Sequence, residues 1–493
     1  METAVNIQLI DSIENRPYIN GQYCSLSDSL LLSKKSPLRQ LQLKPLFDCT
    51  ACEVDEAVNA ANASYLSRVW CDKPVRERKQ IIFAWADIIE ANLTYLAQLD
   101  TLETGRAYRN FIEDSIPKAI SVVRWFAEAV DKVHDESYQP NSQELALVAR
   151  EPLGVVAAIL PWNDPLVVAA WKIAPALLMG NSVVIKPAEE ASYSILAIAA
   201  MATSAGLPDG VLNVVTGRGE VTGEALARHP KVRGLFFTGS SAVGKKMLFY
   251  AGESNMKKIG LECGGKSPFI LTRNYANLPH AAEVLAKNIF YNQGQICSSP
   301  SRLIIDKEIK KSFLSLLYRA AKIYVPADPF NPQTTVGSIV SQEQYQRIQG
   351  FIQRAKQAGI EPVVIEGDAA IPTNGYYIAP TIFDEVTPDS ELAQQEIFGP
   401  VLIIHSYEHI EEALHLANNT HYGLAASVWT NDINEAFFCS RRLEAGMVHV
   451  NSYGDDDNAV PFGGVKESGI GKDKSLHALN EYCELKTTWI KLN

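Results

Sequence analysis

Strand-like and helix-like segments alternate from about residue 154 to residue 265, and this alternation constrains the fold more than any other feature. Apolar runs rich in β-branched residues are followed by longer segments with helical spacing, separated by short connections containing Gly, Pro or Asn. The expected strands span residues 154–160, 182–187, 211–217, 234–239 and 257–261, and the expected helices span residues 165–180, 192–206, 221–229 and 242–252. Such a series predicts a parallel sheet covered on both faces, which binds ligands beyond the carboxyl ends of its strands.

A second alternating series predicts a second α/β unit, in keeping with a chain of 493 residues that is too long for one ordinary domain. Its expected strands span residues 267–271, 301–308, 401–407, 424–430 and 447–453. The first fifty residues indicate peripheral strands, whereas residues 53–133 have helical spacing that we expect to break at Gly105, a residue type suited to a helix C-terminus. Residues 144–151 and 483–493 alternate like edge strands.

Composition excludes several classes of partner. The formal net charge of −11 argues against nucleic acid and anionic membranes as partners. No stretch approaches the roughly 20 apolar residues that a membrane-spanning helix needs. The eight cysteines are scattered without a framework, which predicts reduced thiols and a cytoplasmic protein. None of the nine histidines has a convincing metal-ligand spacing, so we expect no metal site.

Two segments at the ends of expected strands could bind a dinucleotide. Residues 239–244 (GSSAVG) join a strand to a helix, where Gly239 would let the backbone approach a phosphate and the helix N-terminus would offer free N–H groups. Lys186 and Glu189 end another strand, and a carboxylate there would accept from a ribose 2′-hydroxyl but repel a 2′-phosphate. On these residues alone, an ordinary turn and a solvated charged loop remain open.

Cys297 and Glu262 are candidates for covalent catalysis. Small and polar residues surround Cys297, which lies between an expected helix and an expected strand, so its thiol could be accessible. Glu262 follows a strand and precedes two glycines, a place from which a carboxylate can reach into a cleft. Together they would suit a nucleophile and a general base, although a buried inert thiol and a surface carboxylate are the alternatives.

Seven spaced motifs together resemble those of a known protein family. In order, they are PWN (161–163), KPAE (186–189), FTGS (237–240), LECGGKS (261–267), NQGQIC (292–297), EIFGPV (396–401) and PFGGVKESG (461–469). Over essentially its whole length the chain resembles the aldehyde dehydrogenase superfamily, which implies an NAD-dependent enzyme that oxidises an aldehyde to a carboxylic acid.

The resemblance also implies residue roles. Cys297 matches the nucleophile, Asn163 the side chain that stabilises the oxyanion, and Glu262 the general base that activates water. The positions that match cofactor contacts or line the cofactor site are Trp162, Lys186, Glu189, Gly239, Ser240, Glu396 and Phe398. Lys172 matches a position that lines the site.

Departures from the family pattern suggest a substrate. Asp164 stands where many members have an aromatic residue, and Asp455, Asp456 and Asp457 fall where the family lines its substrate tunnel. An acidic tunnel would attract a cationic substrate, whose alkyl chain could pack on Trp171, Tyr291 and Phe462; a solvated acidic loop is the alternative. The carboxyl-terminal run 471–490 resembles enzymes acting on γ-glutamyl-γ-aminobutyraldehyde and related ω-aminoaldehydes of polyamine breakdown. Betaine aldehyde and broad-specificity aliphatic aldehydes remain open.

The implied fold is α/β, with a Rossmann-like cofactor domain, an α/β catalytic domain and a small β oligomerisation element. The expected division gives residues 1–130 and 152–262 to the NAD-binding domain, residues 263–465 to the catalytic domain, and residues 131–151 and 466–493 to the oligomerisation element. The small element implies a homodimer or homotetramer. Three rivals stay open: a CoA-acylating enzyme, which would commonly lack Glu262, a catalytically silent structural member of the fold, and a thiol hydrolase.

Overall fold

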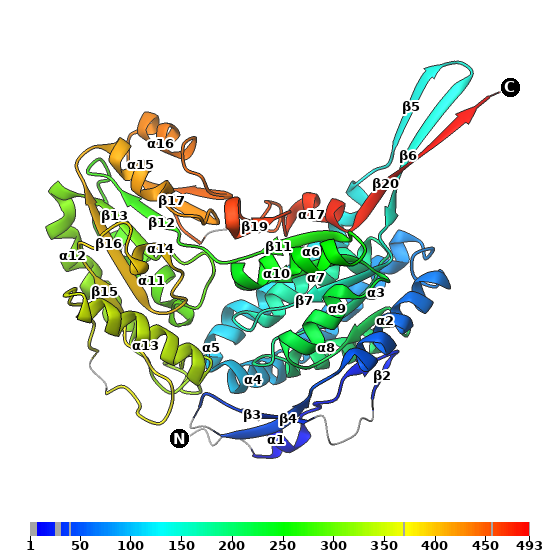
Figure 1. Ribbon diagram of the computed structural model, residues 1–493, viewed down its shortest axis with the longest axis horizontal. Coiled ribbons are helices and arrows are strands. Elements are labelled where there is room, and N and C mark those ends of the chain that lie inside the picture. The colour runs from blue at the N-terminus through cyan, green and yellow to red at the C-terminus, as the bar shows by residue number, and fades with distance from the viewer. Residues whose placement is uncertain (1–6, 25–30, 39–40, 368–369, 455–456, 493) are drawn as a thin grey trace.

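The computed structural model describes residues 7–24, 31–38, 41–367, 370–454 and 457–492. Two large sheets, each accompanied by helices, make up the body of the molecule, and a small sheet projects from it near the C-terminus (Figure 1). No helix among the described residues is long and apolar enough to cross a membrane.

The first large sheet contains eight strands in the order β19-β11-β10-β7-β8-β9-β1-β2. Its five central strands are parallel, as the alternating series predicts. The edge strands β19, β1 and β2 pair antiparallel, and they come from outside that series. The bounds are β1 Tyr18–Ile19, β2 Gln22–Tyr23, β7 Val155–Ile159, β8 Ser182–Lys186, β9 Leu212–Val214, β10 Val232–Thr238, β11 Lys258–Glu262 and β19 Gly469–Ile470.

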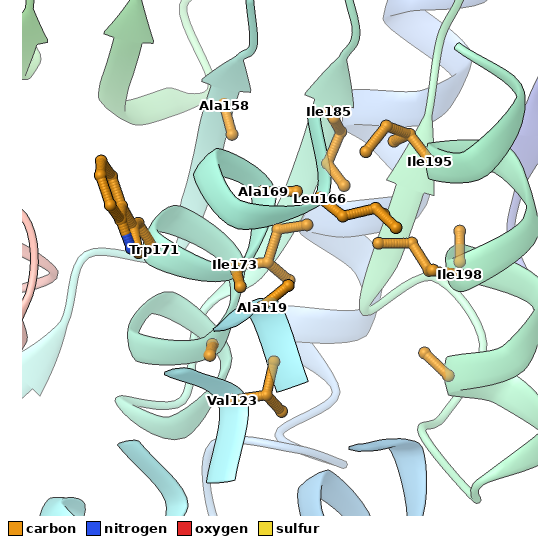
Figure 2. Packing of buried hydrophobic residues seen from close by; sticks show 14 of the residues in the cluster. Ala119, Val123, Ala158, Leu166, Ala169, Trp171, Ile173, Ile185, Ile195 and Ile198 are labelled. Carbon is orange, nitrogen blue, oxygen red and sulfur yellow. The ribbon is translucent and has the colours of Figure 1, made fainter. Parts of the chain in front are cut away.

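Helices cover both faces of this sheet because neighbouring strand residues point to opposite sides. Val156 and Ala158 of β7 pack in the core formed with α3, α4, α6, α7 and α8, whereas Val155 and Ala157 pack in the core formed with α2, α9 and α10. Figure 2 shows part of the first of these cores, with labelled side chains from α6, α7, α8, β7 and β8. The helices are α2 Ala51–Leu66, α3 Val75–Ala91, α4 Leu93–Thr104, α5 Tyr108–Asn110, α6 Ile116–Ala129, α7 Pro165–Leu178, α8 Tyr193–Ser204, α9 Glu224–Arg228 and α10 Ser241–Glu253.

Three local features refine the expectations from sequence. Helix α4 ends at Gly105, whose φ of 74° is left-handed, so the expected break is confirmed. The helix expected over residues 221–229 is a π-helical turn, Gly219–Gly223, followed by α9. A second π-helical turn, Phe111–Ser115, precedes α6; such turns are frequent at functional sites.

The second large sheet has seven strands in the order β14-β15-β16-β13-β12-β17-β18. All of its pairs are parallel except β14 with β15. Its strands are β12 Pro268–Leu271, β13 Arg302–Asp306, β14 Val363–Val364, β15 Thr381–Phe383, β16 Val401–Tyr407, β17 Ala425–Trp429 and β18 Met447–Val450. Its helices are α11 Leu278–Phe290, α12 Lys307–Ala321, α13 Gln342–Gln357, α14 Glu391–Gln394, α15 Ile410–Asn418 and α16 Ile433–Ser440.

The small sheet has the order β20-β6-β5 and stands away from the body (Figure 1). Its strands are β5 Glu136–Asn141, β6 Glu144–Pro152 and β20 Cys483–Lys491, and all three pair antiparallel. The two edge strands expected from sequence are therefore partners of each other. Helix α17, Ser475–Glu481, leads into β20. Near the N-terminus, α1 Ile7–Ser12 precedes a hairpin of β3 Leu31–Lys35 and β4 Gln42–Phe47.

Candidate active site

The direction of the strand order reverses between β7 and β10. From β7 the chain proceeds through β8 and β9 to one side, and then returns to place β10 and β11 on the other side. Loops that leave neighbouring strands in opposite directions open a crevice at their carboxyl ends, which is where open α/β sheets bind ligands. Residues 160–163 follow β7 and Gly239 follows β10, so both motifs lie at this crevice.

A cavity of about 820 Å³ occupies the crevice and extends to the second large sheet, within the usual size range of a ligand pocket. Most of the residues expected at the site line it. They are Trp162, Asn163, Asp164, Trp171, Gly239, Ser240, Glu262, Tyr291, Cys297, Glu396, Phe398 and Phe462. Lys186, Glu189, Lys172 and Asp457 are not among the lining residues. Asp455 and Asp456 lie outside the described residues.

Cys297 follows the turn that ends α11 and is partly buried. Gly265 packs against its backbone, since a Cβ on Gly265 would lie 2.6 Å from the Cys297 carbonyl oxygen. Burial, with the carboxylates of Glu396 and Glu262, raises the pKa of the Cys297 thiol to about 12. At neutral pH the thiol therefore needs a base or a nearby positive charge before it can act as a nucleophile.

Asn163 is fixed by a tight loop from the second sheet. The side-chain Nδ2 of Asn163 donates to the backbone carbonyl of Gln295 (3.1 Å), and the backbone carbonyl of Asn163 accepts from Asn292 Nδ2 (3.0 Å). Asn292 and Gln293 have φ values of 48° and 57°, a left-handed conformation that non-glycine residues rarely adopt. Strained backbone of this kind clusters at functional sites. The loop holds an amide donor beside the segment that carries Cys297.

Glu262 is the last residue of β11 and is buried at the base of the cavity. Neither of its carboxylate oxygens has a hydrogen-bond partner among the described residues. Burial and the carboxylate of Asp473 raise its pKa well above the usual range, against the lowering effect of Lys172 and Lys472. Lys172 itself is buried and its Nζ donates to Asp473 Oδ2 (2.9 Å), so it lies behind Glu262 in an ion pair.

Glu396 and Phe398 lie on a loop that faces Cys297 across the cavity. Glu396 Oε1 accepts from the Gly265 N–H (3.0 Å), and a Cβ on Gly264 would lie 2.3 Å from its Oε2. Burial raises the pKa of Glu396 to about 7, against the lowering effect of that N–H. Phe398 meets Trp162 edge to face, with ring centroids 5.3 Å apart. The loop therefore presents a carboxylate and an aromatic face to the same space.

Groups that could hold a dinucleotide lie at the other end of the crevice. Ser240 caps α10 by accepting from Val243 N (3.4 Å), and the buried hydroxyl of Thr238 just before it has no partner among the described residues. At the end of β8, Lys186 Nζ donates to Glu189 Oε2 (3.0 Å) and the Gly219 N–H donates to Glu189 Oε1 (2.7 Å). A helix N-terminus, an unused hydroxyl and a carboxylate with spare acceptor capacity match the pyrophosphate and ribose of such a cofactor.

The expected acidic mouth is partly neutralised. Asp164 accepts from the Ser115 hydroxyl, and its Oδ2 lies 3.2 Å from Nη1 of Arg106, a buried cation. Arg106 Nη2 also donates to Tyr291 OH (2.8 Å), which in turn donates to Asp114 Oδ2 (2.7 Å). One cation is thus shared by two carboxylates. Exposed Asp457 accepts from the Ala459 N–H within its own loop.

An apolar wall faces the mouth. The rings of Trp171 and Phe462 have centroids 4.8 Å apart, and Figure 2 shows Trp171 pointing away from the other labelled side chains of α7. Tyr453, which also lines the cavity, donates from its hydroxyl to the Ser298 carbonyl, one residue after Cys297. The mouth therefore combines aromatic surface with charge.

Sequence reasoning missed several lining residues. They include Asn110, Glu113, Asp114, Lys118, Lys287, Asn288, Gln344, Arg347, Met447, His449 and Tyr453. The π-helical turn carries Glu113 and Asp114, and no periodic pattern shows that it reaches the site. Tyr453 stands two residues before the expected tunnel aspartates, so its place in the loop was the one available signal.

A family model described as the aldehyde dehydrogenase family matches residues 27–488. The chain belongs to the aldehyde dehydrogenase family. The expected fold is confirmed by solved structures that superpose over nearly the whole chain. The expectation of an NAD-dependent aldehyde dehydrogenase is confirmed as an NAD(P)-dependent aldehyde dehydrogenase.

Three proteins illustrate what the chain is similar to. The chain is 44% identical to the NADP/NAD-dependent aldehyde dehydrogenase PuuC of Escherichia coli, over 98% of this chain and 96% of that protein. It is 42% identical to the γ-glutamyl-γ-aminobutyraldehyde dehydrogenase of Burkholderia cenocepacia (99% of each chain, TM-score 0.95). It is 41% identical to the indole-3-acetaldehyde dehydrogenase AldA of P. syringae, solved in complex with NAD⁺ and IAA (99% of each chain, TM-score 0.95).

Proposed function

We propose that the protein oxidises an ω-aminoaldehyde, such as γ-glutamyl-γ-aminobutyraldehyde, to the carboxylic acid with NAD, through a thioester on Cys297. The observation that carries the chemistry is that one cavity brings together a thiol, an unpartnered carboxylate and an amide donor, those of Cys297, Glu262 and Asn163. Ser240, Lys186 and Glu189 would hold the adenosine half of the cofactor, and Glu396 and Phe398 its nicotinamide half. When bound, the oxidised nicotinamide supplies the hydride acceptor.

In the first half of the reaction the thiol adds to the aldehyde carbon. Because the pKa of Cys297 is about 12, its proton must leave as the sulfur attacks. The Glu262 carboxylate, with no hydrogen-bond partner among the described residues, accepts it. The aldehyde oxygen becomes an oxyanion, to which Asn163 donates with the Nδ2 hydrogen that does not point at Gln295. Loss of hydride from the adduct leaves the thioester.

In the second half Glu262 acts as a general base. It first releases the Cys297 proton to solvent and then takes a proton from a water molecule. The oxygen of that water adds to the thioester carbon, the carbon–sulfur bond breaks to release the acid, and the proton on Glu262 returns to the sulfur of Cys297. Burial raises the pKa of Glu262, which makes its carboxylate a stronger base than an exposed one. An intact Glu262 disfavours transfer of the acyl group to CoA.

The preference for an amino-bearing aldehyde is supported by charged side chains at the mouth. Asp114 and Asp164 lie against the cation of Arg106, and Glu113, Lys118 and Lys287 also line the cavity, so both signs of charge are present. Carboxylates and cations together suit the glutamyl group of γ-glutamyl-γ-aminobutyraldehyde, which carries one ammonium and one carboxylate. The wall of Trp171 and Phe462 would pack against the carbon chain. The B. cenocepacia relative, named for an aminoaldehyde substrate, supports the same reading. Betaine aldehyde and broad aliphatic specificity are the alternatives.

An aldehyde panel tests both parts of the proposal. NADH formation is measured with propanal, hexanal, benzaldehyde, betaine aldehyde, 3-aminopropanal and γ-glutamyl-γ-aminobutyraldehyde. We expect the highest kcat/KM for the last two, and no activity for Cys297→Ala. The matched control is Cys263→Ala, which removes the other thiol of the same cavity and keeps activity. A preference for hexanal or benzaldehyde contradicts the substrate; an active Cys297→Ala contradicts the thioester.

The small sheet supports a proposal for assembly. β20, β6 and β5 project from the body, and large apolar side chains such as Leu485 (62% exposed) and Trp489 (56% exposed) lie on this sheet. Exposed strand edges and apolar side chains favour pairing with a second copy. We propose a homodimer or homotetramer built through residues 131–151 and 466–493. Light scattering measures the molar mass in solution. We expect the mass of a dimer or tetramer for the wild type and the mass of a monomer for the Leu485→Lys/Trp489→Lys double variant.

A further inference from the structure

Lys34 of β3 is a buried cation. It is distant in sequence from the residues of the proposed cofactor end, but it lies close to them in space. Its side chain is 7% exposed, and Nζ lies 2.5 Å from Glu103 Oε1. The same Nζ donates to the backbone carbonyl of Glu189, 155 positions later in the chain. It also lies over the ring of Tyr193, 4.9 Å from the centroid. Lys34 therefore joins the N-terminal hairpin to the loop that ends β8.

Glu103 gives this cation a rigid base. Its carboxylate is fully buried and accepts from the N–H groups of Ser192 and Tyr193 (2.9 Å each), which begin α8. A buried charge is tolerated only when it is paired and hydrogen-bonded, and both conditions hold here. The ion pair thus fixes the start of α8 and the preceding turn at Glu189 in one position.

The carboxylate of Glu189 is held as well. Lys186 occupies one oxygen and the Gly219 N–H the other, at 3.0 and 2.7 Å. Gly219 is positioned in turn by Arg218, whose N–H and Nε donate to the two oxygens of Asp48 (2.9 and 2.8 Å). Each carboxylate oxygen keeps a second lone pair free, so Glu189 can still accept hydrogen bonds. It cannot turn away without losing these contacts.

We infer that Lys34 is a positioning residue that sets the cofactor preference by locking Glu189 at the adenosine ribose. The inference rests on the proposed cofactor end of the crevice. A locked carboxylate accepts from a free 2′-hydroxyl, whereas a 2′-phosphate would bring further negative charge against a group that is unable to move aside. Without Lys34 the Glu189 carbonyl loses its charged donor, the turn relaxes, and the carboxylate can rotate away from the ribose.

Binding of adenosine fragments tests this role without catalysis. The dissociation constants of adenosine 5′-monophosphate and adenosine 2′,5′-bisphosphate are measured by calorimetry with the full-length protein. We expect the wild type to bind the monophosphate more tightly. In Lys34→Met the dissociation constant of the bisphosphate divided by that of the monophosphate should fall about tenfold. The fall should come mainly from weaker binding of the monophosphate, as expected for the loss of a charge-assisted hydrogen bond. Lys44→Met is the control, because Lys44 lies on β4 of the same hairpin but its Nζ donates to the carbonyls of Asp11 and Ile13, away from Glu189.

A second variant separates positioning from folding. Lys34→Met leaves Glu103 buried without its cation, which can destabilise the protein. Lys34→Met/Glu103→Gln removes both charges and still lacks the donor to Glu189, so it should fold and show the same loss of discrimination. If the folded double variant keeps the wild-type ratio, the role of Lys34 is overturned, but the proposed cofactor end is not. A wild type that binds neither nucleotide overturns the proposed cofactor end together with it.

Discussion

Replacing Asn163 with Ala should slow the chemical step far more than it destabilises the fold. One preorganised donor to a developing oxyanion contributes about 3 kcal/mol, so kcat should fall roughly 100-fold. The cost to stability is smaller, because the Gln295 carbonyl that loses Asn163 keeps Asn292 Nδ2 as a donor at 3.3 Å. Losing one such hydrogen bond costs about 1 kcal/mol.

Steady-state kinetics and urea unfolding measure the two quantities separately. The control is Asn288→Ala, which removes another side-chain amide from the same cavity. The Nδ2 of Asn288 donates to the carbonyls of Val284 and Tyr453, so this amide is already engaged elsewhere. We expect this control to keep kcat within about fivefold of wild type. The reasoning is refuted if Asn163→Ala keeps kcat within the same range, or if its loss of rate is matched by a comparable loss in the free energy of unfolding.

Three further variants address the carboxylates around Cys297. Glu262→Gln should slow hydrolysis of the thioester about 10²- to 10⁴-fold, the usual worth of a general base. At alkaline pH solvent hydroxide can take the Cys297 proton in place of Glu262, so stopped-flow absorbance at that pH should show a burst of NADH before a slow steady state; a uniform slow phase contradicts it. Asp473→Asn removes the negative charge that raises the pKa of Glu262, so the base stays ionised to lower pH and the acid limb of the kcat/KM profile should move to lower pH; an acid limb that stays or rises argues against the assignment. Gly264→Ala places a Cβ 2.3 Å from Glu396 Oε2 and should displace that flexible carboxylate from the Gly265 N–H, weakening NAD binding in a fluorescence titration with little change in melting temperature. NAD affinity equal to wild type would remove Glu396 from the cofactor site.

The parallel core of the first sheet could be predicted because local patterns determine it. Alternating apolar runs and helical segments give strands β7 to β11, and the motifs at their carboxyl ends follow from the topology. Peripheral strands are expected in the first fifty residues, but the pairing of β1 with β9 and of β19 with β11 could not be predicted, because these strands join the sheet from distant parts of the sequence. β5 is exposed at all six positions, so it lacks the period-two apolar pattern that indicates a strand.

Long-range charge pairing limits prediction of the site. The sequence shows Asp164 as an unusual acid, but only the structure brings it to Arg106, 58 positions earlier, whose cation offsets its charge. Lys34 and Glu189 are 155 positions apart, and nothing in either segment indicates the other. Motifs identify which residues can do chemistry, whereas the partners that tune them come from the packing of separate elements.

The central claim is a thioester on Cys297, and intact-protein mass spectrometry of Glu262→Gln tests it most directly. The variant is mixed with NAD and 3-aminopropanal at alkaline pH, and peptide mapping follows. We expect a mass increase equal to the acyl group minus one hydrogen, located on Cys297 and released by hydroxylamine. NADH formation with no adduct, or an adduct on Cys263 in the same cavity, would contradict the account.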